Sequence, residues 1–471
     1  MHKDCVMKAK QFVLKALHYI ITVALFYYTF LLFRYDGTPD YQDVGFRYNY
    51  LVTAGYGTLV LFFNRTYNAY LFGYSRIRTM AFAQCLSQFF SMSIIYFGVS
   101  LGWNHWRIPG YFMTLMLIYA PYNLLFTYIG RQHYFHLNHT RKALLIYRNN
   151  ADRKRFECFI GKPTEYLYKV IKEIQFDGKF TEIKDELDQG YDAVMVSGVN
   201  SQCRNGILKY CEDHGIRGFF LPHVGDVIMR GARHVQSFDS PVLMARRKIL
   251  SPEYQLLKRL GDFLISLIGL IVLSPVFLAT AIAIKSYDHG PVFYKQVRLT
   301  KDGKQFKIIK FRSMKVDAEK DGVARLSSGD NDDRITPVGR IVRKCRLDEL
   351  PQLINILKGD MAFVGPRPER PEIAEQYCKM MPDFKLRLQV KAGLTGYAQV
   401  YGKYNSDPYE KLEFDLMYIN DMNILTDLVL MFARVGILFS SESTAGVAEG
   451  AVTAMNCGDD TGRTINRTET A

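Results

Sequence analysis

One stretch of the sequence, residues 343–355, reads RKCRLDELPQLIN, and residues 358–369 follow it as KGDMAFVGPRPE. Two adjacent carboxylates, Asp348 and Glu349, stand here between basic residues and Pro351. Proline keeps the residue before it out of the α region, and it suits the first turn of a helix. The pattern therefore predicts that a helix begins or kinks at Pro351, with the two carboxylates at this irregular point.

A helix N-terminus carries partial positive charge and free N–H groups, which favour an anion such as phosphate. Asp348 can act there as a nucleophile toward a phosphoryl group. Glu349, with Asp348 beside it, can hold Mg²⁺, which usually takes one or two carboxylates together with substrate phosphate. Arg343 and Arg367 can supply planar donors for phosphate. The competing interpretation is an acidic helix cap among solvated basic residues, which is the more common situation for an isolated Asp-Glu pair.

Several motifs occur in a fixed order around this stretch. They are Lys310-Phe-Arg312-Ser-Met314, Asp333-Arg-Ile-Thr336-Pro337-Val-Gly339-Arg340, Leu347-Asp-Glu-Leu-Pro-Gln-Leu353, Gly359-Asp-Met361, Gly365-Pro-Arg-Pro368, and Gly393-Leu-Thr-Gly396 with Ala398-Gln399. As an ordered set, residues 254–440 resemble the bacterial sugar transferase family, that is, the monotopic phosphoglycosyl transferases or polyprenyl-phosphate hexose-1-phosphate transferases. The apolar front end adds a resemblance to the large, WbaP-like branch. One departure is Ala392, which stands where the family usually has proline.

The resemblance implies a reaction in two steps. Asp348 attacks the sugar-linked phosphate of a UDP-sugar and expels the nucleoside monophosphate, and polyprenyl (undecaprenyl) phosphate then captures the covalent phosphosugar. Mg²⁺ on Glu349 offsets the charge of the diphosphate. Five other side chains are implied to orient phosphates or to steady the dyad: Arg343, Arg367, Lys310, Arg312 and Gln352. The product would begin the assembly of an exopolysaccharide, capsule or O-antigen-type glycan, and galactose, glucose or an N-acetylated sugar all remain compatible.

The net charge of +14 is compatible with nucleic acid, anionic lipid or phosphorylated substrates. Because the basic residues cluster beside apolar stretches, we do not expect a nucleic-acid binder. The 8 cysteines show no CxxC spacing, so we expect free thiols in a reducing compartment and not a zinc site.

Four apolar stretches within residues 1–135 predict a bundle of four transmembrane helices, at residues 16–33, 48–63, 80–102 and 108–130. A span needs about 20 apolar residues, so the last two are the clearest and 48–63 is the weakest. Lys and Arg exceed Asp and Glu before the first span and after the fourth, which predicts that both ends of the bundle face the cytoplasm.

Residues 140–250 predict a Rossmann-like α/β domain. Strands are expected at residues 143–147, 191–196 and 216–221, with helices at 164–173 and 204–211, and this alternation is typical of a parallel sheet. No Gly-rich turn follows the first strand, so no dinucleotide cradle is expected. Regulation, another mode of nucleotide binding, and dimerisation remain open as roles.

Residues 263–284 form an uncharged run that is long enough to cross a bilayer, yet basic residues flank it on both sides. Ser274 and Pro275 lie in its middle, and proline bends a helix by removing a backbone hydrogen bond. We expect a re-entrant helix-break-helix that returns to the cytoplasmic side; a fifth span with a proline kink is the alternative. A hairpin of strands at 291–294 and 306–311 should open the mainly helical catalytic domain, and residues 441–471 should form a disordered tail.

The sequence thus predicts a membrane protein of mixed α and α/β class, with its catalytic domain on the cytoplasmic face of a bacterial inner membrane. Its partners would be a UDP-sugar, polyprenyl phosphate and membrane lipids, and a homodimer follows from the large-branch resemblance alone. Two alternatives stay open: a nucleotide-sugar or lipid-phosphate hydrolase, and a non-catalytic membrane scaffold for polysaccharide synthesis.

Overall fold

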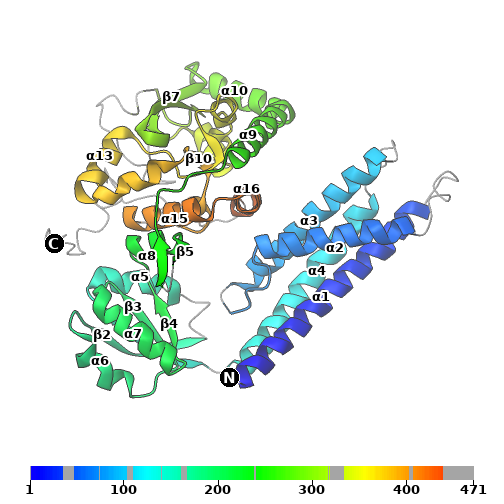
Figure 1. The fold of residues 1–471 in the computed structure, drawn as a ribbon. Helices are drawn as coiled ribbons and strands as arrows, with labels where there is room; N and C mark the ends of the chain where they lie inside the picture. The colour runs from blue at the N-terminus through cyan, green and yellow to red at the C-terminus, as the bar shows by residue number, and fades with distance from the viewer. Residues whose placement is uncertain are drawn as a thin grey trace. The chain divides into compact units, whose positions relative to one another are not determined.

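A computed structural model describes residues 2–35, 47–73, 75–102, 110–138, 140–160, 167–237, 240–316, 318, 332, 334–402 and 407–438. The predicted tail, residues 441–471, lies outside them. The chain divides into two compact units, residues 1–221 and 222–471, and each unit is described by itself (Figure 1). Both the helical and the α/β character that the sequence predicts are present.

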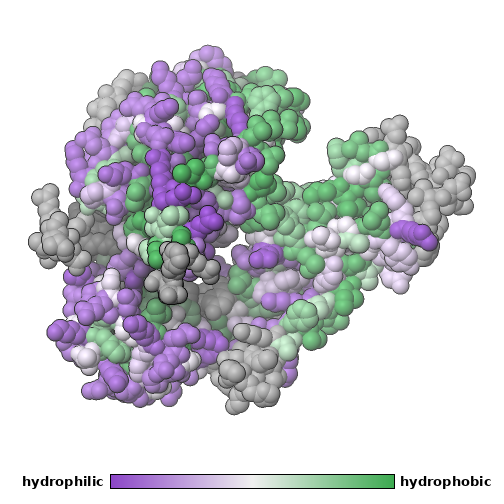
Figure 2. All heavy atoms as spheres, viewed as in Figure 1, coloured by the Kyte–Doolittle hydropathy of each residue, from purple (hydrophilic) through white to green (hydrophobic). Residues whose placement is uncertain are grey.

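Four helices open the first unit: α1 (His2–Tyr35), α2 (Arg47–Thr66), α3 (Ile77–Gly102) and α4 (Gly110–Leu137). Each helix packs against two others, so they form a closed bundle. Stacked aromatic rings fill its centre, with the centroids of Phe26 and Tyr56 3.8 Å apart. The outer faces are apolar as well, since Leu51 is 70% and Leu117 76% exposed (Figure 2). Helices that are apolar on all sides are typical of membrane spans.

Three helices in the described part of the chain are long and apolar enough to cross a membrane, namely Ala9–Phe33, Ile77–Gly102 and Gly110–Leu137. The predicted span at 48–63 does form a helix, α2, but α2 is not one of these three. Arg47 and Asn49 at its start and Asn64 and Arg65 at its end make this short helix less apolar than its neighbours. The expectation of four spans is therefore confirmed for three of the helices.

The remainder of the first unit holds a parallel sheet of four strands in the order β2-β1-β3-β4. The strands are β1 (Arg141–Tyr147), β2 (Tyr168–Gln175), β3 (Ala193–Ser197) and β4 (Arg217–Phe220). The connecting helices are α5 (Asn150–Ile160), α6 (Phe180–Leu187) and α7 (Ser201–Asp213). Every residue of the central strand β3 is buried, as a strand covered on both faces requires. The predicted parallel α/β arrangement is confirmed.

One element of this sheet was predicted wrongly. The expected helix at 164–173 is instead the edge strand β2, as far as the described residues from 167 onward show. β2 pairs along the whole length of β1, from Arg141 opposite Tyr168 to Tyr147 opposite Gln175. These main-chain bonds to an open sheet edge outweigh the weak local preference of a segment that is mostly exposed.

The second unit begins with α8 (Val224–Arg230) and the antiparallel strands β5 (Arg233–Ser237) and β6 (Ser240–Met244). Two apolar helices follow, α9 (Pro252–Val272) and α10 (Ser274–Asp288), bent by 62° at the predicted break. The hydroxyl of Ser274 donates to the Ile271 carbonyl at 2.7 Å. That carbonyl is the one that Pro275, lacking an N–H, cannot satisfy, so the Ser-Pro pair both makes and stabilises the bend.

The body of the second unit is built from short elements. In order they are β7 (Phe293–Leu299), a 3₁₀ turn (Lys301–Gly303), β8 (Gln305–Phe311), α11 (Pro337–Lys344), the 3₁₀ turn η4 (Leu347–Glu349), α12 (Gln352–Lys358), β9 (Ala362–Val364), α13 (Pro371–Met380), η5 (Pro382–Gln389), β10 (Gly393–Thr395), α14 (Tyr397–Val400), α15 (Pro408–Asp421) and α16 (Ile424–Leu438). β7 and β8 form the predicted hairpin, while β9 and β10 pair in parallel.

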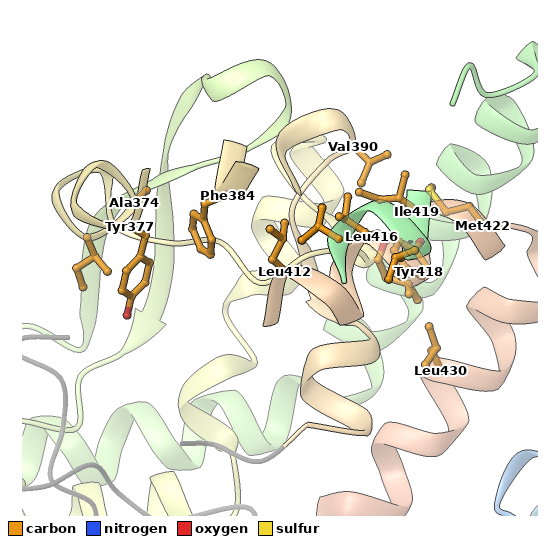
Figure 3. Packing of buried hydrophobic residues seen from close by; sticks show 14 residues of the cluster. Ala374, Tyr377, Phe384, Val390, Leu412, Leu416, Tyr418, Ile419, Met422 and Leu430 are labelled. Atoms are coloured by element: carbon orange, nitrogen blue, oxygen red, sulfur yellow. Dashed lines mark hydrogen bonds between the residues drawn. The ribbon is translucent and has the colours of Figure 1, made fainter. Parts of the chain in front are cut away.

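The main core cluster of this unit gathers buried side chains from α13, η5, α15 and α16 around Phe384, Leu412 and Leu430 (Figure 3). Val224 and Val227 of α8 belong to the same cluster. α8 therefore packs into the core of the second unit, although it lies within the range that we expected to form the middle domain.

Candidate active site

The two carboxylates lie in η4, a single 3₁₀ turn between α11 and α12. Arg346, the residue before this turn, has a left-handed backbone with φ of 55°. α12 begins at Gln352 directly after Pro351, as predicted, but it spans only 7 residues. The dyad precedes this helix and does not lie in its first turn, so arginine side chains supply the positive charge around the carboxylates.

Glu349 is enclosed by arginines from three parts of the fold. Its Oε1 accepts a hydrogen bond from Arg367 Nη2 at 3.0 Å, and its Oε2 accepts one from Arg434 Nη2 at 3.1 Å. Arg346 Nη1 lies 3.7 Å from Oε1. Burial by itself would raise the pKa of Glu349, but Arg367, Arg434 and Lys310 outweigh it and hold the pKa well below its usual range. Glu349 is therefore ionised at any ordinary pH.

Asp348 is held much less tightly. Its Oδ1 is buried and accepts no hydrogen bond. Burial and the neighbouring charge of Glu349 raise the pKa of Asp348 to about 6, against the opposing effects of Lys310, Arg343 and Arg346. A carboxylate oxygen with no donor keeps its lone pairs available, so this atom suits a nucleophile. The two adjacent carboxylates thus have opposite environments, which is how a site separates their roles.

Lys310 on β8 lies close enough to the dyad to interact electrostatically with both carboxylates, and β8 is in contact with η4. Burial, followed by the charges of Arg367 and Arg298, lowers the pKa of Lys310 to about 8. The ammonium group therefore remains mostly charged at neutral pH and is available to an anion.

A network of buried groups holds the backbone of the Gly-Pro-Arg-Pro segment. Arg387 Nη2 donates to the Arg367 carbonyl at 2.8 Å, and Arg298 Nη1 donates to the Pro368 carbonyl at 3.1 Å. Arg387 is itself fixed by Asp415, 2.7 Å away. The two prolines and these bonds fix the backbone that presents the Arg367 side chain before substrate binds.

The same segment crosses β10 at close range. A Cβ added to Gly365 would lie 2.4 Å from the Lys391 carbonyl oxygen, so only glycine fits. Nearby, the N–H of Ala392 donates to Thr300 Oγ1 at 3.1 Å. A proline at this position has no N–H to donate. A hydrogen bond therefore holds the turn in this chain, where a proline would hold it by ring geometry.

The structure brings three of the predicted residues into interaction with the dyad, buries a fourth just after it, and places three others elsewhere. Arg367 donates a hydrogen bond to Glu349. The charges of Lys310 and Arg343 both act to lower the pKa of Asp348, and Gln352 is buried at the start of α12. Arg312 instead pairs with Asp288 at the end of α10. Ser274 and Pro275 lie at the bend between α9 and α10.

Sequence reasoning did not identify Arg434 or Arg346 as contacts of Glu349. Arg434 is one of only two charged residues in α16, and this isolation in an apolar segment was the signal available. Its partner, 85 positions away, depends on tertiary packing.

The carboxylate pair fits a Mg²⁺ site of the kind that substrate phosphate completes. Among the described residues no group of three or more His, Cys, Asp or Glu side chains could hold a metal ion. Mg²⁺, however, commonly binds through one or two carboxylates together with substrate phosphates. Oδ1 of Asp348 has no partner, and each oxygen of the ionised Glu349 has a second lone pair besides the one that accepts its arginine hydrogen bond, so the two residues provide such a pair.

Comparison with known proteins places the similarity in the second unit. Residues 253–441 match the model of the bacterial sugar transferase family. A UDP-N-acetylgalactosamine-undecaprenyl-phosphate N-acetylgalactosaminephosphotransferase of Aeromonas hydrophila is 39% identical over 188 residues, which cover 39% of this chain and 44% of that protein. A UDP-glucose:undecaprenyl-phosphate glucose-1-phosphate transferase of Escherichia coli is 41% identical over 212 residues, 44% of each chain.

The matched region thus spans less than half the length of these two relatives. A putative undecaprenyl-phosphate N-acetylgalactosaminyl 1-phosphate transferase of Bacillus subtilis is 45% identical over 135 residues, which cover 29% of this chain and 74% of that protein. With the ordered motifs, the carboxylate pair and these matches in agreement, the chain belongs to the bacterial sugar transferase family.

Proposed function

We propose that this protein transfers a sugar 1-phosphate from a UDP-sugar to undecaprenyl phosphate and releases UMP, through a covalent phosphosugar on Asp348. The observation that carries the proposal is the buried Oδ1 of Asp348, which has no hydrogen-bond donor and lies beside an ionised, arginine-held Glu349. The names of the three relatives described above all refer to transfer of a sugar phosphate to undecaprenyl phosphate, which supports the same reaction here.

In the first step, Asp348 Oδ1 attacks the sugar-linked phosphorus of the donor. The bond between this phosphorus and the bridging oxygen breaks, and its electron pair leaves with UMP. Lys310, Arg343 and Arg367 place positive charge where the phosphate oxygens gain negative charge, which is the main protein contribution to phosphoryl transfer. Mg²⁺ held by Glu349 and Asp348 together with the donor phosphates would neutralise charge on the diphosphate.

In the second step, a phosphate oxygen of undecaprenyl phosphate attacks the same phosphorus. The bond to Asp348 breaks, the carboxylate regains its electron pair, and a lipid-linked diphosphate sugar leaves. Because the enzyme is modified between the two substrates, the kinetics are ping-pong.

The membrane arrangement is part of the proposal. α9 and α10 form a re-entrant pair that returns to the cytoplasmic side, α1 to α4 all cross the bilayer, and the catalytic unit faces the cytoplasm at the inner membrane. Arg259 of α9 supports this, since it donates to the carbonyls of Ile356 and Leu357 at 2.7 and 2.8 Å. These bonds hold the first half of α9 on the catalytic unit, while Val272 near the bend is 67% exposed. The domains proposed are residues 1–135, 140–221 and 222–440, because α8 packs in the core of the catalytic unit, and the protein is proposed to form a homodimer.

Purified protein given UDP-sugars with and without undecaprenyl phosphate tests the reaction. We expect UMP release over many turnovers, and a lipid-linked diphosphate sugar, only when the correct donor and the lipid are both present. Continuous release of free sugar phosphate without lipid would indicate a hydrolase, and absence of UMP with every donor would indicate a scaffold. Asp348→Asn is the negative control.

Labelling of the exposed thiol of Cys345 tests the topology. A membrane-impermeant reagent should modify the Cys345 peptide, identified by mass spectrometry, in inside-out vesicles and not in intact spheroplasts. Modification only from the outside would mean that α9 and α10 together cross the bilayer.

A further inference from the structure

α16 is apolar except for two charged residues, Asp427 and Arg434. The two charges lie about two turns apart, roughly 10 Å along the axis. Each one contacts a different functional part of the second unit. Leu430, between them, is fully buried in the main core cluster, so this helix is firmly packed between its two polar contacts (Figure 3).

Asp427 ties α16 to the membrane-inserted helix α9. Its Oδ2 accepts hydrogen bonds from Lys258 Nζ at 2.6 Å and from the Tyr254 hydroxyl at 2.8 Å, and both donors lie on α9. Its Oδ1 lies 2.8 Å from the hydroxyl of Tyr418 on α15. The side chains of Lys258 and Asp427 are only 14% and 12% exposed, so water screens this ion pair weakly.

Arg434 ties the other part of α16 to the catalytic dyad. It donates to Glu349 Oε2 at 3.1 Å, and the two side chains are 14% and 6% exposed. Since Arg367 holds the other oxygen of Glu349, the carboxylate is fixed by one arginine from the Gly-Pro-Arg-Pro segment and one from α16. Removing either arginine leaves a buried carboxylate oxygen without its donor.

We propose that α16 is a positioning element that couples the seating of α9 in the membrane to the geometry of the catalytic carboxylates, with Arg434 as the positioning residue of Glu349. Lys258 and Tyr254 fix α16 through Asp427, and α16 in turn fixes Arg434. This inference rests on the proposed function.

Packing alone does not explain the two charges. A buried ion pair stabilises a fold no better than apolar side chains of the same volume, so a purely structural helix has no need of either one. Here both charges sit in an apolar helix, and each meets a partner from an element that handles substrate or membrane.

The first test compares Arg434→Met, Arg434→Lys and the matched surface control Arg246→Met in lipid nanodiscs. We expect Arg434→Met to lower kcat for UMP release by roughly 10–100-fold, the usual effect of removing a residue that orients a catalytic ligand. The KM for the UDP-sugar should change much less, and Arg434→Lys should recover part of kcat because it keeps the charge. Arg246 is exposed, so Arg246→Met should match the wild type.

Thermal unfolding of each variant shows whether it is folded. Equal melting temperatures with reduced kcat support a positioning role. If Arg434→Met loses stability, kcat of the Arg434→Lys variant still tests whether Arg434 positions Glu349, since lysine preserves the charge and most of the volume. Wild-type kcat in folded Arg434→Met would overturn the proposal.

The second test asks whether the two contacts act as one. Substitutions that are this far apart and share no partner normally have multiplicative effects on rate. We expect Asp427→Asn to lower kcat several-fold by itself, and to lower it no further when Arg434→Met is present. Full multiplication of the two losses would show independent contacts and overturn the coupling. Failure of the wild type to make lipid-linked sugar would instead refute the proposed function.

Discussion

At the scale of single residues, Asp348 and Glu349 are neighbours with opposite surroundings. Glu349 has a donor on each oxygen, whereas Asp348 Oδ1 has none. The consequence is one carboxylate that is fixed and permanently charged beside one that titrates at about 6. A buried charged oxygen without a donor destabilises the fold, and here that oxygen is the reactive atom. Such a conflict between stability and activity is common at active sites.

Asp348→Asn should abolish transfer, with UMP release reduced by more than about 1,000-fold, because an amide cannot form the acyl phosphate. Since Oδ1 has no donor to lose, the fold should not suffer. A folded pKa above the unfolded one means that ionised Asp348 opposes folding at neutral pH. The melting temperature of the variant at pH 7 should therefore equal or exceed that of the wild type, as differential scanning fluorimetry can measure.

The rate of UMP release should follow a bell-shaped pH profile. It rises with pH through about 6 as Asp348 loses its proton, and it falls above about 8 as Lys310 loses its charge. Steady-state rates between pH 5 and 9.5 in a constant-ionic-strength buffer measure both limbs.

Two variants assign these limbs. Arg343 lowers the pKa of Asp348, so Arg343→Gln should move the acid limb to higher pH. Lys310→Arg keeps its charge in alkaline solution and should extend the upper limb. An acid limb that stays in place in Arg343→Gln would contradict the assignment to Asp348.

At the scale of elements, the bend between α9 and α10 depends on two adjacent residues with complementary effects. Pro275 leaves the Ile271 carbonyl without its helical donor, and the Ser274 hydroxyl supplies a replacement. In a bilayer no water is present to donate a hydrogen bond to an unsatisfied carbonyl. This local bond therefore contributes more to stability than it would on the surface of a soluble protein.

Pro275→Ala should straighten the pair, because residue 275 regains an N–H for the Ile271 carbonyl. Spin labels on α9 and α10, read by double electron–electron resonance, should report a longer distance than in the wild type. Ser274→Ala should keep the bend and lower the melting temperature, since only the replacement donor is lost. An unchanged distance in Pro275→Ala would show that tertiary contacts, and not the proline, set the 62° bend.

At the scale of the whole molecule, the division of the chain falls at residues 221 and 222, before α8. Val224 and Val227 of α8 are buried against the second unit, and the Tyr409 hydroxyl accepts a hydrogen bond from the Val224 N–H at 3.2 Å. α8 is therefore part of the catalytic unit's own core.

A truncated protein of residues 222–471 should consequently be more stable than one of residues 251–471. Loss of α8 removes two buried valines from the cluster, and each is worth about 1.5–3 kcal/mol of burial. Thermal unfolding in one detergent compares the two proteins. Equal melting temperatures would mean that α8 contributes nothing to this unit.

Local patterns were sufficient for much of this protein. The uncharged run interrupted by Ser274 and Pro275, the β7–β8 hairpin, the parallel sheet and the dyad before Pro351 all follow from neighbouring residues. In each case the determining physics acts over a few positions, through backbone restriction, hydrophobic run length or turn chemistry.

Tertiary packing decided the rest. The strand β2 exists because β1 offers it an open edge, and Arg312 pairs with Asp288 and not with the dyad. Arg434 reaches Glu349 only because α16 packs against α14, β9 and β10. By itself the sequence determined that the carboxylate pair lies just before Pro351 and where the apolar helix pair breaks. The partners of those side chains come from distant positions, and which charge meets which is fixed by how the elements pack.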